Sequence, residues 1–177
     1  MKKILLMVVA AMMAAVSVNA QGEWKNEVSI AYGAGSSTDL ISSIYKGMFT
    51  GKQLNYWGPV SLEYFYRPSE KLGIGVIGTI SGCKWDEGKG DPKSTFYSVL
   101  PAIKYNWKVR EHVSMYSKLG LGLTIASDSD ALEKNSSTVF NFQASFFGIE
   151  FGSAFRGFAE LGFGEQGVIL AGLRYKF

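Results

Sequence analysis

Large apolar side chains alternate with small or polar ones along most of this chain, and this period of two constrains the fold more than any other feature. Successive side chains of a strand point to opposite faces, so the alternation predicts strands with one apolar face. It occurs in eight segments: residues 24–33, 54–67, 72–84, 95–107, 113–125, 138–152, 157–164 and 168–177. Its phase changes near Phe146 and Phe147, which predicts a β-bulge.

The charges within these segments share one register with the glycines, serines and alanines, whereas the bulky residues occupy the other register. An eight-stranded barrel has an interior that side chains just fill, so it cannot enclose the bulky set. The sequence therefore predicts an inverted barrel, with bulky residues facing lipid and charged residues inside, paired because an unpaired buried charge is costly. These predicted lumen charges are Glu63, Lys104, Lys118, Glu160, Arg174 and Lys176.

Long connections (34–53, 85–94 and 126–137) alternate with tight ones (68–71, 108–112 and 153–156), and only 165–167 is short where a long connection is due. This alternation is typical of outer-membrane barrels. Aromatic residues gather at the strand ends beside the tight turns, as in a membrane-interface girdle. They are Trp24, Tyr64, Tyr66, Tyr105, Trp107, Phe151, Tyr175 and Phe177. The predicted fold is an all-β, eight-stranded antiparallel up-and-down transmembrane β-barrel.

The first residues have the features of a secretory signal peptide. Lys2 and Lys3 precede an uncharged apolar run, and small residues lead to a predicted cleavage site between Ala20 and Gln21. The alternative, a membrane anchor, is disfavoured because the run is short for a span of roughly 20 residues. Residues 1–20 are thus expected to be a signal peptide and 21–177 the barrel domain.

The last ten residues read VILAGLRYKF, with Tyr175 and Phe177 at the end of the apolar face. This ending resembles the terminal strand of bacterial outer-membrane barrels, where such aromatics serve as the insertion signal. The whole pattern of residues 24–177 resembles the small eight-stranded outer-membrane protein family, which includes OmpX and the transmembrane domain of outer-membrane protein A. The resemblance implies a monomer in a Gram-negative outer membrane, surrounded by lipid and inserted by the barrel-assembly machinery.

No cofactor, metal site or catalytic centre is expected. Residues 162–167 match G-x-G-x-x-G, but a dinucleotide site needs a helix behind the motif and a strand follows here. His112, the only histidine, falls in a tight turn, and Cys83, the only cysteine, has no second histidine as a base. Without Lys2 and Lys3, 16 basic residues face 15 acidic ones and form no basic patch, so no nucleic-acid partner is expected.

One stretch, residues 39–49, has helical spacing and is predicted to be a loop or short helix on the external side, or a surface-binding element. Its apolar stripe is Leu40, Ile41, Ile44, Tyr45, Met48 and Phe49. Because the barrel fold hosts adhesins, anchors and enzymes alike, it does not specify an activity. We expect a non-enzymatic structural or surface-interaction protein; the alternatives are a narrow gated pore, a lipid-modifying enzyme and a secreted soluble barrel that binds an apolar ligand.

Overall fold

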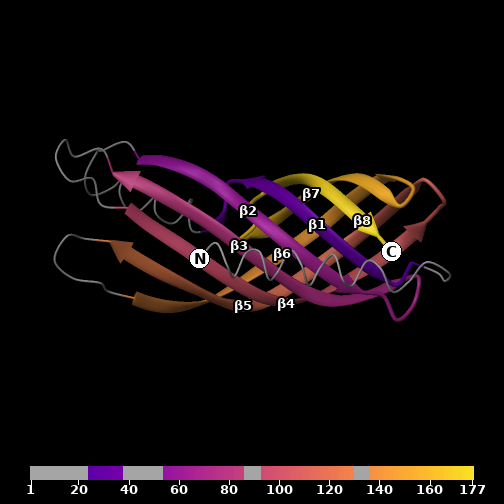
Figure 1. Ribbon diagram of the computed structural model, residues 1–177, viewed down its shortest axis with the longest axis horizontal. Helices are drawn as coiled ribbons and strands as arrows, with labels where there is room; N and C mark the ends of the chain where they lie inside the picture. The colour runs from indigo at the N-terminus through magenta and orange to yellow at the C-terminus, as the bar shows by residue number, and fades with distance from the viewer. Residues whose placement is uncertain (1–23, 38–53, 86–92, 130–135) are drawn as a thin grey trace.

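The computed structural model describes residues 24–37, 54–85, 93–129 and 136–177, and these residues form a closed antiparallel barrel (Figure 1). Each strand pairs with the next, and β8 returns to pair with β1. The strands are β1 (Asn26–Ala34), β2 (Leu54–Tyr66), β3 (Leu72–Trp85), β4 (Lys93–Val109), β5 (Val113–Ser129), β6 (Ser136–Gly152), β7 (Phe155–Gly164) and β8 (Ile169–Lys176). The predicted fold class is confirmed. Within these ranges, no helix combines the length and the apolar character needed to cross a membrane.

Each predicted segment coincides with a strand, and the largest difference lies at the end of β5. This strand continues to Ser129 because Ser127, Asp128 and Ser129 still pair with β4, although the apolar alternation has stopped at Ile125. Backbone hydrogen bonds, which any residue except proline can make, extend a strand without an apolar pattern. The sequence signal therefore marks the part of each strand with two contrasting faces, not its whole length.

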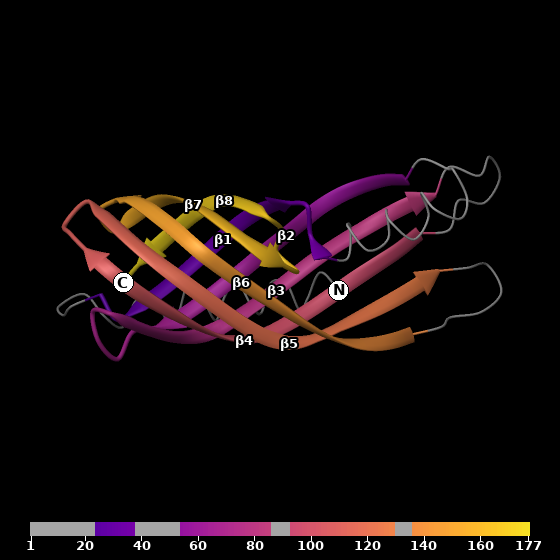
Figure 2. The ribbon, with the colours of Figure 1, turned by 180° about the vertical axis from the view of Figure 1, so that it is seen from behind.

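The wall of the barrel has unequal height. Strands β3 to β6 have 14 to 17 residues, whereas β7, β8 and β1 have 10, 8 and 9. Strands β2 to β6 consequently extend past the other three, toward the left of Figure 1, and Figure 2 shows the same step from behind. The described tight turns and the C-terminus lie at the opposite end, where Asn26 and Phe177 exchange backbone hydrogen bonds of 2.9 Å.

Side chains point as the inverted pattern predicts. Leu62 and Leu173 face outward with exposed fractions of 39% and 48%, whereas their neighbours Glu63 and Arg174 are buried inside the barrel. The same contrast separates exposed Leu119 from buried Lys118 on β5. Two small apolar clusters complete the interior; their members are Phe65, Ile77, Leu100 and Ala102 in one and Ala31, Phe158 and Leu170 in the other.

The predicted bulge in β6 is confirmed. The register of β6 with β7 shifts between Ser145 and Phe147, so Phe146 and Phe147 both lie on the exposed wall. The pairing of β6 with β5 shifts at the same place, since Tyr116 lies opposite Gly148 and Lys118 lies opposite Ser145. An extra residue in a strand leaves the side-chain alternation in opposite phase before and after it, which decides what β6 presents to the interior.

Candidate functional site

The structure places all six predicted lumen charges inside the barrel, buried and within one ion-pair network that also includes four further charged residues. The network joins side chains that come from seven different strands and from the turn after β2. Its carboxylates are Glu27, Glu63, Glu150 and Glu160, and its cations are Arg67, Lys104, Lys118, Arg156, Arg174 and Lys176. We call this set the interior ion-pair network.

Arg174 lies at the centre of the network. Its Nη1 donates to Glu150 at 2.6 Å and its Nη2 to Glu63 at 3.0 Å, and it lies within 4 Å of the two other network carboxylates. Its guanidinium plane also lies over the rings of Phe158 and Tyr116, at 4.3 and 5.0 Å. Arginine suits this position because its planar fork contacts several carboxylates at once and stacks on aromatic faces.

Three lysines link the same carboxylates on other sides. Lys104 donates to Glu27 at 2.6 Å, and Lys118 bridges Glu63 at 2.5 Å and Glu160 at 2.8 Å. Lys176 donates to Glu150 near the tight-turn end of the barrel. Every network carboxylate therefore has at least two cationic partners, and this pairing offsets the cost of burying charge in a narrow interior.

Four members of the network are not among the predicted lumen charges. Glu150 lies beyond the bulge in β6, and Arg156 lies beside the turn before β7. At both places, alternation counted from the strand centre no longer predicts the inward face. Glu27 does lie in the inward register, two residues before Ser29, so its position could have been recognised from alternation alone. Arg67 directly follows β2 and reaches back to Glu27 at 3.3 Å.

The connection between β7 and β8 turns into the barrel and closes the interior at the end opposite the tight turns. Glu165 and Gln166 are fully buried. Glu165 accepts hydrogen bonds from Ser98 at 2.8 Å and from Asn141, while Gln166 donates to Glu63 at 2.8 Å. The positive φ angles of Gly164 (136°) and Gly167 (106°) permit this inward turn. The G-x-G-x-x-G letters thus form a strand end and a turn.

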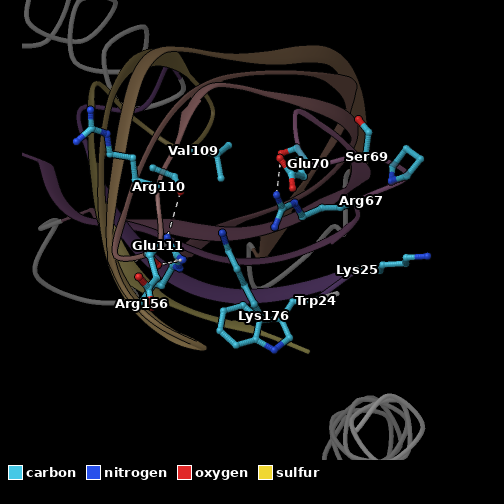
Figure 3. Close-up of a pocket in the computed structure, with 12 residues that line it drawn as sticks. Trp24, Lys25, Arg67, Ser69, Glu70, Val109, Arg110, Glu111, Arg156 and Lys176 are labelled. Carbon is cyan, nitrogen blue, oxygen red and sulfur yellow. Dashed lines mark hydrogen bonds between the residues drawn. The ribbon is translucent and has the colours of Figure 1, made fainter. Parts of the chain in front are cut away.

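At the other end the network borders a cavity of about 590 Å³ (Figure 3). The cavity lies among the tight turns, and Arg67, Arg156 and Lys176 line it together with Glu70 and the ring of Trp24. The interior is consequently asymmetric: the inward-turned Glu165 and Gln166 fill one end, and a cationic hollow forms the other.

The ring of Tyr116 packs against Gly148 of the neighbouring strand. A Cβ at Gly148 would lie 2.5 Å from the Tyr116 ring, which also donates through its hydroxyl to Glu160 at 2.7 Å and lies 4.4 Å from Lys104 Nζ. A side chain at position 148 would therefore displace the ring from its ionic partners.

We expect Gly148→Val to lower the free energy of unfolding by about 1–3 kcal/mol, the usual cost of overpacking. Denaturant titration in lipid vesicles measures this change. Gly157→Val is the matched control, because a Cβ at Gly157 would meet no atom within 4 Å. Equal stabilities of the two variants would contradict the packing role of the glycine.

Three other predicted features have different outcomes. Tyr175 and Phe177 stack with ring centroids 5.8 Å apart; Tyr175 is 36% exposed, whereas Phe177 is 6% exposed. Its backbone pairs with Asn26 at the barrel rim, beyond the last residue of β8. His112 is exposed in the turn between β4 and β5.

The apolar stripe from Leu40 to Phe49, the signal peptide and the side chain of Cys83 lie outside the described residues. In the part of the chain that the structure describes, no three His, Cys, Asp or Glu side chains form a group suited to hold a metal ion.

No family model and no curated protein matches the chain. Among solved structures, the N-terminal β-barrel domain of Pseudomonas aeruginosa OprF is similar with 14% identity and a TM-score of 0.48, over 89% of this chain and 100% of that one. Ail, the attachment invasion locus protein of Yersinia pestis, is similar with 20% identity and a TM-score of 0.47, over 88% and 100%. The similarity is one of fold, and the closed eight-stranded barrel follows from this chain's own strand pairing.

Proposed function

We propose that this protein is an integral, monomeric barrel of a Gram-negative outer membrane that has a structural or surface-interaction role and catalyses no reaction. The observation that carries the proposal is the inversion of the wall, with bulky apolar side chains outside and charges inside. The outward set includes residues from all eight strands, for example Ile30, Leu62, Ile74, Val99, Leu121, Phe140, Leu161 and Leu173.

An aqueous environment fits this surface poorly. Monomeric soluble proteins rarely expose a contiguous apolar patch larger than a few hundred Å², whereas here apolar side chains face outward on every strand. Lipid removes that cost, and closure of the barrel satisfies the backbone groups that lipid could not. The exposed rings of Tyr66, Tyr105 and Trp107 at the tight-turn end support an interfacial girdle there.

Membrane location can be tested by extraction. We expect the protein to stay in the membrane fraction through washes with alkaline carbonate and urea, and to dissolve only in detergent. A closed barrel should also migrate faster on a gel before boiling than after it. Release of the protein with the periplasmic fraction would instead support the secreted soluble barrel.

The packed interior supports a barrel that does not conduct ions. The ion-pair network spans the lumen, and Gln166 joins the inward turn to this network through Glu63. We expect purified protein in planar bilayers to give no reproducible open level. A defined conductance that recurs between preparations would favour the narrow gated pore.

A lipid-modifying enzyme would need a nucleophile with a base at the rim opposite the tight turns, and His112 lies at the tight-turn end. We expect lipopolysaccharide incubated with the purified protein to keep its mass. Loss of an acyl chain from the lipid would contradict the non-enzymatic role.

Tyr175 and Phe177 are proposed to form the signal that the barrel-assembly machinery recognises before the strand closes on β1. The long connections are proposed to face outward from the cell, because outer-membrane barrels place their tight turns on the periplasmic side.

A further inference from the structure

The cavity at the tight-turn end carries more positive charge than the rest of the interior. Within the described residues, the interior ion-pair network contains six cations and four carboxylates, which leaves two positive charges in excess. Of the network cations, Arg67, Arg156 and Lys176 line the cavity, whereas Lys104, Lys118 and Arg174 do not (Figure 3). The excess charge is therefore located at this mouth.

Both arginines combine neutral acceptors with one carboxylate that other cations share: Arg67 Nε lies 3.3 Å from Glu27, and Arg156 Nη1 lies 3.5 Å from Glu150. Arg156 donates to the carbonyls of Ser153 and Glu111 at 2.8 and 2.9 Å and to the Ser114 hydroxyl at 3.1 Å. Arg67 donates to the carbonyl of Glu70 at 2.7 Å, and its Nε makes no hydrogen bond among the described residues. Carbonyl oxygens orient a guanidinium without cancelling its charge, and each carboxylate partner is shared with three other network cations, so both arginines keep net positive charge and are preorganised for an anion.

Carboxylates also line the cavity, but at its exposed rim. Glu70 and Glu111 are solvent-exposed, whereas the side chains of Arg67, Arg156 and Lys176 are at most 10% exposed. Charges that face water are screened within about 10 Å at 0.1 M salt, while buried ones are screened less. A concave site with buried cations therefore keeps a positive potential despite the acidic rim.

We propose that this cavity, the basic vestibule, binds a small multivalent oxyanion, a phosphate or a carboxylate compound. Its volume of about 590 Å³ lies within the range of small-molecule sites, roughly 300–1,000 Å³. Arginine forks match the oxygen geometry of both anions, and the Trp24 ring at the edge offers an apolar surface and a fluorescent reporter. This proposal goes beyond the structural role and does not depend on the location of the barrel.

The test uses the full mature barrel folded in a nonionic detergent and titrated with inorganic pyrophosphate or with tricarballylate. Calorimetry and tryptophan fluorescence report binding, and spermidine serves as a cationic probe of similar size. We expect saturable binding of at least one anion, weakened by added salt, and none of spermidine. The two anions distinguish a phosphate site from a carboxylate site.

The double variant Arg67→Gln/Arg156→Gln should weaken anion binding by about ten- to a hundredfold, because two charge-assisted contacts are lost. The conservative variant Arg67→Lys/Arg156→Lys keeps the charge and should lose less. Lys108→Gln removes an exposed cation at the same end, outside the cavity, and should bind as the unmodified protein does.

Two results would overturn the proposal: no saturable binding of either anion to the unmodified barrel at millimolar concentration, or equal binding by the glutamine variant and Lys108→Gln. The first result requires no variant to fold.

Discussion

Replacing Arg174 with methionine is expected to lower the free energy of unfolding by about 3–5 kcal/mol, the cost of removing one partner from a buried ion pair. Arg174 is fully buried and donates to Glu63 and Glu150, at 3.0 and 2.6 Å. Methionine has a similar length and no charge, so the carboxylates lose a shared cation without gaining water. Denaturant titration of the barrel in lipid vesicles, followed by tryptophan fluorescence, measures the change.

Two further variants separate charge from geometry. Arg174→Lys keeps the charge but cannot donate to several carboxylates in one plane, so its loss should be intermediate. Adding Glu63→Gln to Arg174→Met removes one of the stranded carboxylates, so the pair should cost less than the sum of the single changes. The exposed control Lys108→Gln should change stability by no more than about 0.5 kcal/mol. A loss for Arg174→Met as small as that of the control would contradict the central role of Arg174.

Alternation alone was sufficient to predict the barrel because its two registers differ so strongly in this chain. A bulky apolar residue directly adjoins a charged one on β2 (Leu62 and Glu63) and on β5 (Leu119 and Lys118). Because the interior is narrow, each of these strands must turn its charged face inward and its bulky face outward. The same alternation predicts the bulge near Phe146, because its phase changes there. Where the contrast persists, local sequence therefore determines strand position, phase and orientation.

Glu150 shows where that information ends. A bulge reverses the phase of everything that follows, so the inward residues after it depend on where the register shifts. The structure places this shift between Ser145 and Phe147, and Glu150 consequently joins Arg174 and Lys176 inside the barrel. One residue of difference in the bulge would point its carboxylate at lipid. A pattern of residues locates such a bulge only approximately.

The inward turn of Glu165 and Gln166 could not be predicted for a different reason. Three polar residues between two strands are typical of an exposed turn. Their burial depends on partners far along the chain, because Ser98 lies 67 residues from Glu165 and Glu63 lies 103 residues from Gln166. It also depends on the low wall formed by β7 and β8, which leaves this turn beside the taller strands β4 to β6 (Figure 2).

Replacing Leu62 with arginine tests the membrane environment directly, and we expect it to cost about 2–4 kcal/mol in a lipid bilayer. Leu62 is outward-facing and pairs with Ile30, the central residue of β1, which in turn pairs with Leu173. This level lies midway along the short wall, so a charge there would enter the hydrocarbon region. Reversible unfolding in vesicles measures the loss.

The matched control is Tyr66→Arg, on the same strand and the same face but opposite Asn26 at the tight-turn end. Near the membrane interface the same charge should cost only about 0–1 kcal/mol, since its guanidinium can reach water. A soluble barrel would show no such dependence on depth, because Leu62 and Tyr66 would both face water and both substitutions would be nearly neutral. The difference between the two variants therefore reports the solvent around the wall, independently of how stable the interior ion-pair network makes the barrel.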